Sequence, residues 1–232
     1  MGPVGLHLGE RSAKWHPASL DAVGDSIERF PLFPLGLVLL PQEVVPLHIF
    51  EDRYKLMIGE CLDQGRPFGI LWLSDDGLRE IGCTAQVTQL LERMDDGRMN
   101  VLVQVAEPFR LLRRIEDLPY PAGDVELLDE QPDGDAGEAQ AGAEARQRYA
   151  DLVERVTDSR PAEADLAELD AYSMAATLDF ALDAKQSLLE LRSEPARLER
   201  LTELFASTLQ RLERAEATAE LARGNGHARR AP

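Results

Sequence analysis

The sequence contains few of the residues that usually mark a metal centre or a disulfide framework. In 232 residues it has two cysteines and four histidines, and neither Cys-x-x-Cys nor His-Glu-x-x-His occurs. Zinc sites need ligands at such short spacings, so the sequence predicts no metal and no other cofactor. Cys61 and Cys83 come without a secretory signature and are expected to be buried thiols in a reducing compartment.

Positive charge is scarce as well. The chain has 25 Lys and Arg against 42 Asp and Glu, a formal net charge of −17, and its lysines are Lys14, Lys55 and Lys185. None of these lysines follows a glycine, which excludes a P-loop, and no Gly-x-Ser-x-Gly nucleophile motif is present. An acidic surface repels both the phosphates of DNA and anionic membranes, so neither is expected as a partner.

Long apolar runs are missing too. A transmembrane helix needs roughly 20 predominantly apolar residues, whereas the longest candidate, Phe30 to Leu40, is shorter and contains two prolines. Residues 1–29 lack the apolar core of a signal peptide and are expected to form a flexible leader. The sequence therefore predicts a cytoplasmic protein.

The most informative segment that is present runs from Phe30 to Tyr54. It is strongly apolar and carries Pro31, Pro34, Pro41 and Pro46. Proline has no N–H to donate and crowds the preceding turn of a helix. The segment is therefore expected to form buried strands separated by turns.

The period of the apolar residues then changes twice. Apolar side chains at helical spacing, from Tyr54 to Leu62, predict an amphipathic helix that ends at Gly65. Strand-like runs follow at Phe68–Leu73, Ile81–Arg93, Met99–Ala106, Phe109–Ile115 and Val125–Leu128, and the turn Asp95-Asp96-Gly97 joins the second to the third.

Beyond this strand-rich block the signals are helical. Helices are expected at Ala143–Thr157, at Glu163–Leu182, from about Ala184, and after an N-cap at Ser193. The fold class is therefore α+β. The expected organisation is a leader at 1–29, a β subdomain at 30–128, an acidic linker at 129–142, a helical subdomain at 143–223 and a disordered tail at 224–232 that begins with Gly224-Asn225-Gly226.

Four separated blocks of the sequence resemble the N-terminal, substrate-binding domain of the Lon-protease family. They are Phe30–Tyr54, Ile81–Ala85, the hairpin around Asp96-Gly97-Arg98 with the strand Phe109-Arg110-Leu111, and Lys185–Glu190 with Arg197-Leu198 and Leu201. The chain departs from the family pattern at Ala106-Glu107-Pro108, where a glycine and often an arginine are usual. The resemblance implies a PUA-like β pseudo-barrel followed by a helical bundle, in a stand-alone member without the ATPase and the serine–lysine protease domain.

The resemblance also implies a function. We expect a non-catalytic polypeptide-binding module that recognises unfolded or tagged polypeptides, as an adaptor or holdase in protein quality control. A protease or chaperone is a further expected partner, and homo-oligomers are compatible with the sequence. The candidate peptide-binding residues are His48, Phe50, Arg53 and Tyr54, at the end of the first block.

Simpler interpretations of these residues stay open. His48 is also explained as a strand-end histidine whose ring nitrogens are satisfied by neighbours, and Arg53 as the partner of Glu51 in an ion pair at the start of a helix. Two other functions are open as well. One is a small-molecule pocket near His48 and Tyr54, by analogy with the cereblon family, whose ligand site lies in a separate zinc domain. The other is RNA binding through an arginine face that would be formed by Arg93, Arg98, Arg110, Arg113 and Arg114.

Overall fold

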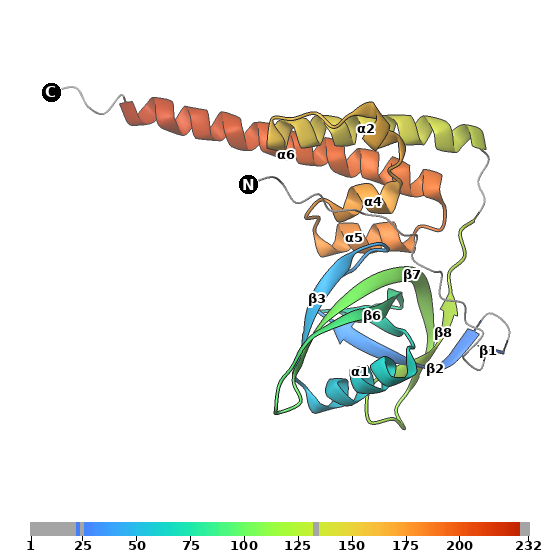
Figure 1. Ribbon diagram of the computed structural model, residues 1–232. Coiled ribbons are helices and arrows are strands. Elements are labelled where there is room, and N and C mark those ends of the chain that lie inside the picture. Colours follow the sequence, from blue (N-terminus) through green and yellow to red (C-terminus); the bar gives the residue numbers. More distant parts are fainter. Residues whose placement is uncertain (1–21, 24–25, 132–134, 228–232) are drawn as a thin grey trace.

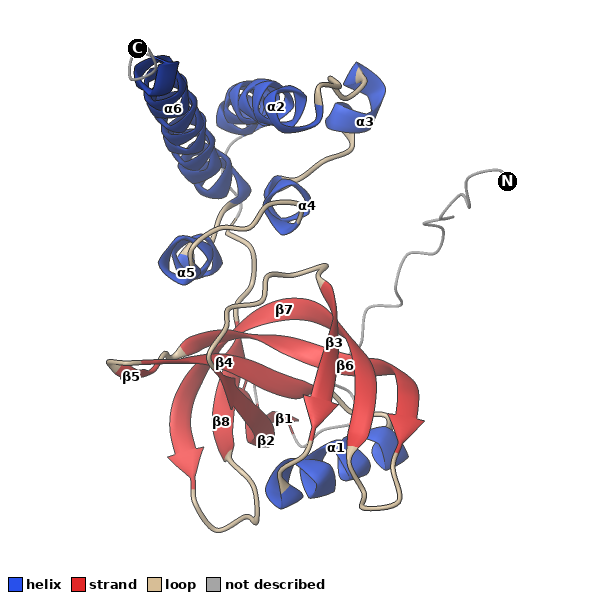
Figure 2. Cartoon of the chain, turned by 90° about the vertical axis from the view of Figure 1, so that its left-hand side faces the viewer, coloured by secondary structure: helices blue, strands red, loops and turns tan. Residues whose placement is uncertain are grey.

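The chain forms a β-barrel with one helix at one end and a layer of helices at the other (Figures 1 and 2). The computed structural model describes residues 22–23, 26–131 and 135–227. Its strands are β1 (Ala22–Val23), β2 (Ser26–Leu35), β3 (Val44–Ile49), β4 (Phe68–Ser74), β5 (Gly77–Leu78), β6 (Ile81–Arg93), β7 (Met99–Ile115) and β8 (Ala122–Leu127). Its helices are α1 (Asp52–Gln64), α2 (Asp135–Thr157), α3 (Glu163–Ala167), α4 (Ala171–Ala176), α5 (Leu182–Glu190) and α6 (Glu194–His227).

The barrel closes through a parallel pair of strands. The strands follow one another in the order β2-β8-β7-β6-β4, and β2 then pairs with β4, from Leu32 opposite Gly69 to Leu35 opposite Trp72. The other neighbours in this ring are antiparallel. β3 lies outside the ring and pairs with the first part of β7. The expected α+β fold, a β pseudo-barrel followed by helices, is confirmed.

The long strand β7 replaces two predicted strands. Met99, Val101, Val103 and Val105 are all buried, as their alternation predicts. The strand continues past Pro108 instead of stopping, because β6 still pairs with it there, with Cys83 opposite Pro108. A register shift in β6 between Cys83 and Ala85 accommodates this stretch.

Helix α1 covers the end of the barrel that lies away from the other helices (Figure 2). Its buried residues are Tyr54, Met57, Ile58 and Cys61, which are the stripe that the sequence predicts. Gly65 ends the helix in the left-handed conformation, at φ 62°, where a glycine is favoured.

At the opposite end, α4 and α5 lie between the barrel and the pair formed by α2 and α6 (Figure 1). Tyr149 of α2 packs on Phe205 of α6, with ring centroids 5.7 Å apart. One cluster of buried apolar residues runs from the barrel through α5 into this helix pair. The two halves of the chain therefore share a core.

Polar contacts hold the helical layer to the loop before β3 and to the start of β6. Lys185 of α5 forms a 2.6 Å ion pair with Glu43, and both side chains are largely buried, at 14% and 9% exposed. Gln186 donates through Nε2 to the carbonyl of Ile81, at 3.2 Å. Gln42 donates to Asp170 at 2.8 Å and accepts from Ser173 at 2.8 Å. The Lys-Gln pair of the fourth sequence block thus joins the helices to the barrel.

Four expectations about where helices and strands begin or end are wrong. Regular structure begins before Phe30, because β2 starts at Ser26 and Ile27 is buried against β8. A single apolar residue, Ile27, is too short a pattern to reveal the extra strand residues. The helix expected at 163–182 is divided into α3 and α4 because Asp170 accepts the N–H of Ser173, at 2.7 Å, and starts a new helix.

The third wrong expectation is the linker at 129–142, and the fourth is the position at which the last helix ends. α2 begins at Asp135, inside the range 129–142, because alanine and glutamate favour helix there despite the glycines. The guanidinium of Arg192 donates to the carbonyl of Asp129, at 2.9 Å, so the start of this range is also held. The backbone of α6 continues through Gly224-Asn225-Gly226 to His227. Most of the expected leader, at 1–21 and 24–25, and the end of the tail, at 228–232, lie outside the described residues.

Candidate functional site

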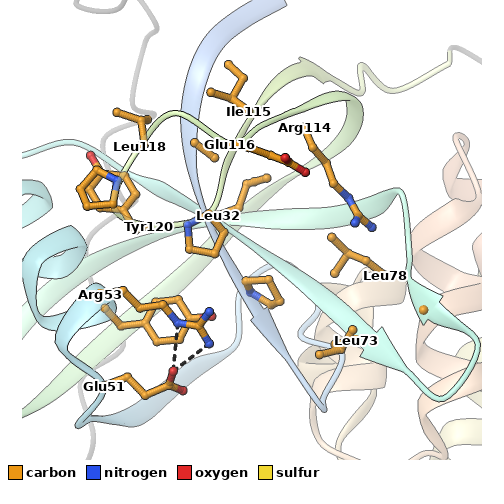
Figure 3. A pocket seen from close by; sticks show the side chains of 16 residues that line it. Leu32, Glu51, Arg53, Leu73, Leu78, Arg114, Ile115, Glu116, Leu118 and Tyr120 are labelled. Carbon is orange, nitrogen blue, oxygen red and sulfur yellow. Dashed lines mark hydrogen bonds and ion pairs between the residues drawn. The ribbon is translucent and has the colours of Figure 1, made fainter.

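A cleft of about 710 Å³ opens on the barrel beside the start of α1 (Figure 3). Its floor comes from β2, one wall from the start of α1, a second from the β4–β5 hairpin and a third from the loop between β7 and β8. Most of its lining is apolar. The lining residues are Leu32, Pro34, Glu51, Arg53, Tyr54, Leu73, Gly77, Leu78, Arg114, Ile115, Glu116, Leu118, Pro119, Tyr120, Pro121 and Ala122.

The wall at α1 is held by an internal ion pair. Nε and Nη2 of Arg53 both reach Oε2 of Glu51, at 2.9 and 2.7 Å (Figure 3). The guanidinium also lies 4.6 Å from the ring centroid of Tyr54. Burial raises the pKa of Tyr54, although the charge of Arg53 acts in the opposite direction. This wall therefore presents a neutral phenol and an already neutralised pair of charges.

The β7–β8 loop is anchored to α1 by Tyr120. Its hydroxyl donates to Oε2 of Glu60, at 2.6 Å, and accepts from Nη2 of Arg66, at 3.1 Å. Burial raises the pKa of Tyr120, and the hydrogen bond to Glu60 raises it further. The phenol stays protonated at neutral pH, so this contact persists and fixes the loop that carries Leu118 over the cleft.

The β4–β5 hairpin supplies an exposed leucine to the cleft. Leu73 is opposite Leu78 in the hairpin and is 52% exposed. The turn between them ends at Gly77, whose φ of 117° requires a glycine. The guanidinium of Arg79, the residue after Leu78, lies 5.2 Å from the ring centroid of Trp72 and so links the two ends of the hairpin.

The structure divides the four candidate binding residues into two pairs. Arg53 and Tyr54 line the cleft. His48 and Phe50 do not line it, and their rings stack on each other with centroids 5.9 Å apart. Nδ1 of His48 lies 2.6 Å from Oδ1 of Asn100, whose amide donates to Glu92 at 2.8 Å. That contact agrees with the simpler interpretation of His48 as a satisfied strand histidine, and the proposed role in peptide binding stays a prediction.

Sequence reasoning missed the residues opposite α1. Leu73 ends a predicted strand, whereas Leu78 and the segment Leu118-Pro119-Tyr120-Pro121 lie between predicted strands. An apolar, proline-containing loop directly after the charged Glu116-Asp117 was the signal available there. Exposed apolar residues in such a loop indicate a contact surface.

Two observations on the described residues concern metal ligands and thiols. No group of three or more His, Cys, Asp or Glu side chains there is arranged to hold a metal ion. Burial raises the pKa of the Cys61 thiol to about 11 and that of Cys83 well above its usual value, so both remain protonated at neutral pH. No described helix is long and apolar enough to span a membrane.

Two solved structures share this architecture. A Lon N-terminal domain protein from Xanthomonas campestris is 24% identical, with a TM-score of 0.56 over 75% of this chain and 97% of that one. The N-terminal domain of a Mycobacterium avium complex Lon protease is 20% identical, with a TM-score of 0.59 over 78% of this chain and 98% of the other. Both show the same fold.

Sequence comparison gives the same result. The Lon protease of Paraburkholderia phytofirmans is 26% identical over 222 residues, which is 89% of this chain and 27% of that protein. The Lon protease of Flavobacterium johnsoniae is 24% identical over 200 residues, or 79% of this chain and 24% of the relative. The chain thus spans about a quarter of these curated relatives. The family model for the ATP-dependent protease La (LON) substrate-binding domain matches residues 29–207, and the chain belongs to this family.

Proposed function

We propose that the chain is a non-catalytic polypeptide-binding module that holds unfolded or tagged polypeptides, as an adaptor or holdase in protein quality control. The apolar cleft between α1, the β4–β5 hairpin and the β7–β8 loop is the observation that carries this proposal. A cleft with apolar walls and exposed leucine at its rim favours extended apolar segments, which folded proteins bury. The family to which the chain belongs is described as substrate-binding.

The cleft is a better peptide site than the open edge of the sheet. β3 is the edge strand beside β7, and an extended peptide adds to such an edge through backbone hydrogen bonds. The N–H of Val105 donates to the carbonyl of Glu43, so by alternation Val45 and Leu47 direct their backbone groups toward β7. Pro46 then faces the open edge without a hydrogen to donate, a common protection against strand addition.

A pair of matched substitutions tests the proposal. Leu73 and Leu112 are both strand leucines, 52% and 53% exposed, but only Leu73 lines the cleft. Leu73→Glu is expected to weaken binding of an unfolded casein-like protein at least about fivefold, because a charge in an apolar contact costs about 1 kcal/mol or more. Leu112→Glu should leave binding unchanged. Fluorescence anisotropy with labelled casein measures both.

The proposal fails if the wild-type protein binds casein no better than an inert acidic protein does. It also fails at this site if both glutamate variants weaken binding equally. Casein recovered from these mixtures without ATP is expected to be intact, because the proposed module has no catalytic step. Casein fragments that appear only when the folded wild-type protein is present would contradict the proposal of a non-catalytic module.

The two other functions receive less support from the geometry. Arg53, Leu73 and Pro119 are exposed at the rim of the cleft, which makes it an open surface site rather than an enclosed small-molecule pocket. The arginines required for an RNA-binding face are separated: Arg98 lies at the β6–β7 turn and Arg114 at the far end of β7. Arg98 and Arg113 are also neutralised, by Asp96 and Asp124 at 2.6 Å each.

A further inference from the structure

A second hollow adjoins the cleft and differs from it in chemistry. Its volume is about 590 Å³, and it shares Arg114, Ile115 and Glu116 with the cleft. Its remaining lining residues are Glu28, Arg29, Arg113, Asp117 and Asp124. A segment that continues past the apolar cleft along the end of β7 therefore enters a charged surface.

Most of the charges in this second hollow are already paired. Arg29 forms an ion pair with Asp117 at 3.1 Å, and its backbone N–H donates to Asp124 at 3.1 Å. Arg113 forms an ion pair with the same Asp124 at 2.6 Å. Burial acts against ionisation of Asp124, but the hydrogen bonds from Arg29 and Arg113 prevail and lower its pKa. These charges neutralise each other and leave little capacity for a ligand.

The groups that remain available carry a negative excess. Glu28 and Glu116 are exposed, and neither has an ion-pair partner within the described residues. Among the arginines that line this hollow, only Arg114 has no ion-pair partner within the described residues. Figure 3 shows its side chain directed toward the β4–β5 hairpin of the cleft. A ligand in this hollow therefore meets two unpaired carboxylates and one unpaired guanidinium. The chain as a whole adds a formal charge of −17.

We propose that the polypeptide segments bound by this chain are apolar stretches with a basic flank, the apolar part lying in the cleft and a lysine or arginine lying against Glu28 and Glu116. This inference rests on the proposed function and names its substrate class. A basic side chain there gains attraction from both carboxylates, whereas an acidic one meets them with only Arg114 to offset the repulsion. The net negative charge of the whole molecule also favours a basic segment and speeds its association with the protein.

Charge-swapped peptides test this inference. Two labelled peptides share a short central run of leucine and phenylalanine and differ only in lysine or glutamate flanks. At about 0.15 M salt, where the Debye length is about 8 Å, the lysine peptide is expected to bind about two- to fivefold more tightly, the range of exposed ion pairs. E28Q/E116Q should reduce this ratio to about one. Higher salt should also reduce the ratio.

A matched variant separates the hollow from the overall field. E163Q/E199Q removes the same two charges from exposed positions on α3 and α6, and it should keep the preference for lysine. Equal binding of the two peptides, tighter binding of the glutamate peptide, or an equal loss of preference in both variants would overturn the inference while the proposed function stands. If neither peptide nor unfolded casein binds wild-type protein, the proposed function is wrong, and the inference fails with it.

Discussion

Gly82 shows how a single residue limits the barrel. A Cβ at this position would lie 2.1 Å from the carbonyl oxygen of Ile70 and 2.7 Å from Leu71 Cδ2. The backbones of β4 and β6 approach each other so closely here that no side chain fits. Gly82 and the fully buried Ala85 belong to the sequence block Ile81–Ala85, and the close packing of the strands explains why both residues are small.

Gly82→Ala is therefore expected to destabilise the protein by about 2–3 kcal/mol or to prevent folding, because the backbone oxygen of Ile70 must move. Gly59, inside α1, is the matched control, because an added Cβ there meets nothing within 4 Å. Gly59→Ala should raise the free energy of unfolding by about 0.5–1 kcal/mol. Urea unfolding followed by circular dichroism measures both. Equal effects of the two substitutions would contradict this account.

At the residue level, two of the four candidate binding residues, Arg53 and Tyr54, lie among those that line the cleft. Arg53 and Tyr54 were identified because a charged and an aromatic residue at a helix start stand out beside an apolar run. Leu73 and Leu118 could not be identified, because their exposure depends on how the hairpin and the loop leave the barrel. An apolar residue in a sequence looks the same whether it is buried in the core or lies at a rim.

At the level of elements, the ion pair of Lys185 and Glu43 joins α5 to the loop before β3. The carboxylate also accepts the N–H of Leu40, at 3.0 Å, so it holds the loop and the helix at once. Gln42 beside it has a φ of 73°, which is unfavourable for a residue with a side chain. Its hydrogen bonds with Asp170, the N-cap of α4, and with Ser173 of α4 offset that strain.

Lys185→Met is expected to lower the free energy of unfolding by about 3 kcal/mol, because the nearly buried Glu43 loses its partner. The double variant Lys185→Met/Glu43→Gln should recover a large part of the loss, since no uncompensated charge remains. Thermal or urea unfolding of the two single variants and the double variant gives the coupling energy. Additive effects would show that the two side chains do not interact.

Elements with strong periodic patterns were predictable, and elements set by tertiary contacts were not. The stripe of α1 and the alternation in β7 are visible in the sequence because one face of each is buried. The division between α3 and α4 was hidden, because leucine and alanine continue through it and only the cap at Asp170 reveals it. The pairing of β2 with β4 was equally hidden, because a sequence pattern carries no information on which strands become neighbours.

At the level of the whole molecule, the buried thiols and phenols predict a loss of stability in alkali. The pKa of Cys61 is raised from its usual 9.0 to about 11, by burial first of all. The unfolded chain then loses this proton first as the pH rises. The stabilisation is complete below about pH 8 and is lost between about pH 9 and 11, where Cys61 alone accounts for about 2–3 kcal/mol.

Urea unfolding at a series of pH values from about 8 to 10.5 measures this loss. The raised pKa values of Tyr54, Tyr120 and Tyr172 add to it above about pH 10, in the same direction. Cys61→Ala should therefore reduce the slope of stability against pH near pH 9.5 without removing it. A wild-type stability that is constant over this range would contradict the burial of these groups.

The closure of the barrel has a consequence for the protein while it is being made. β2 pairs with β8, with Ser26 opposite Glu126, so the first long strand needs a partner that is synthesised about 100 residues later. At about 5–20 residues per second this delay is about 5–20 s. Throughout it, the apolar segment from Phe30 to Leu40 has no complete barrel in which to bury itself. A chain proposed to hold unfolded segments of other proteins thus exposes such a segment of its own during synthesis.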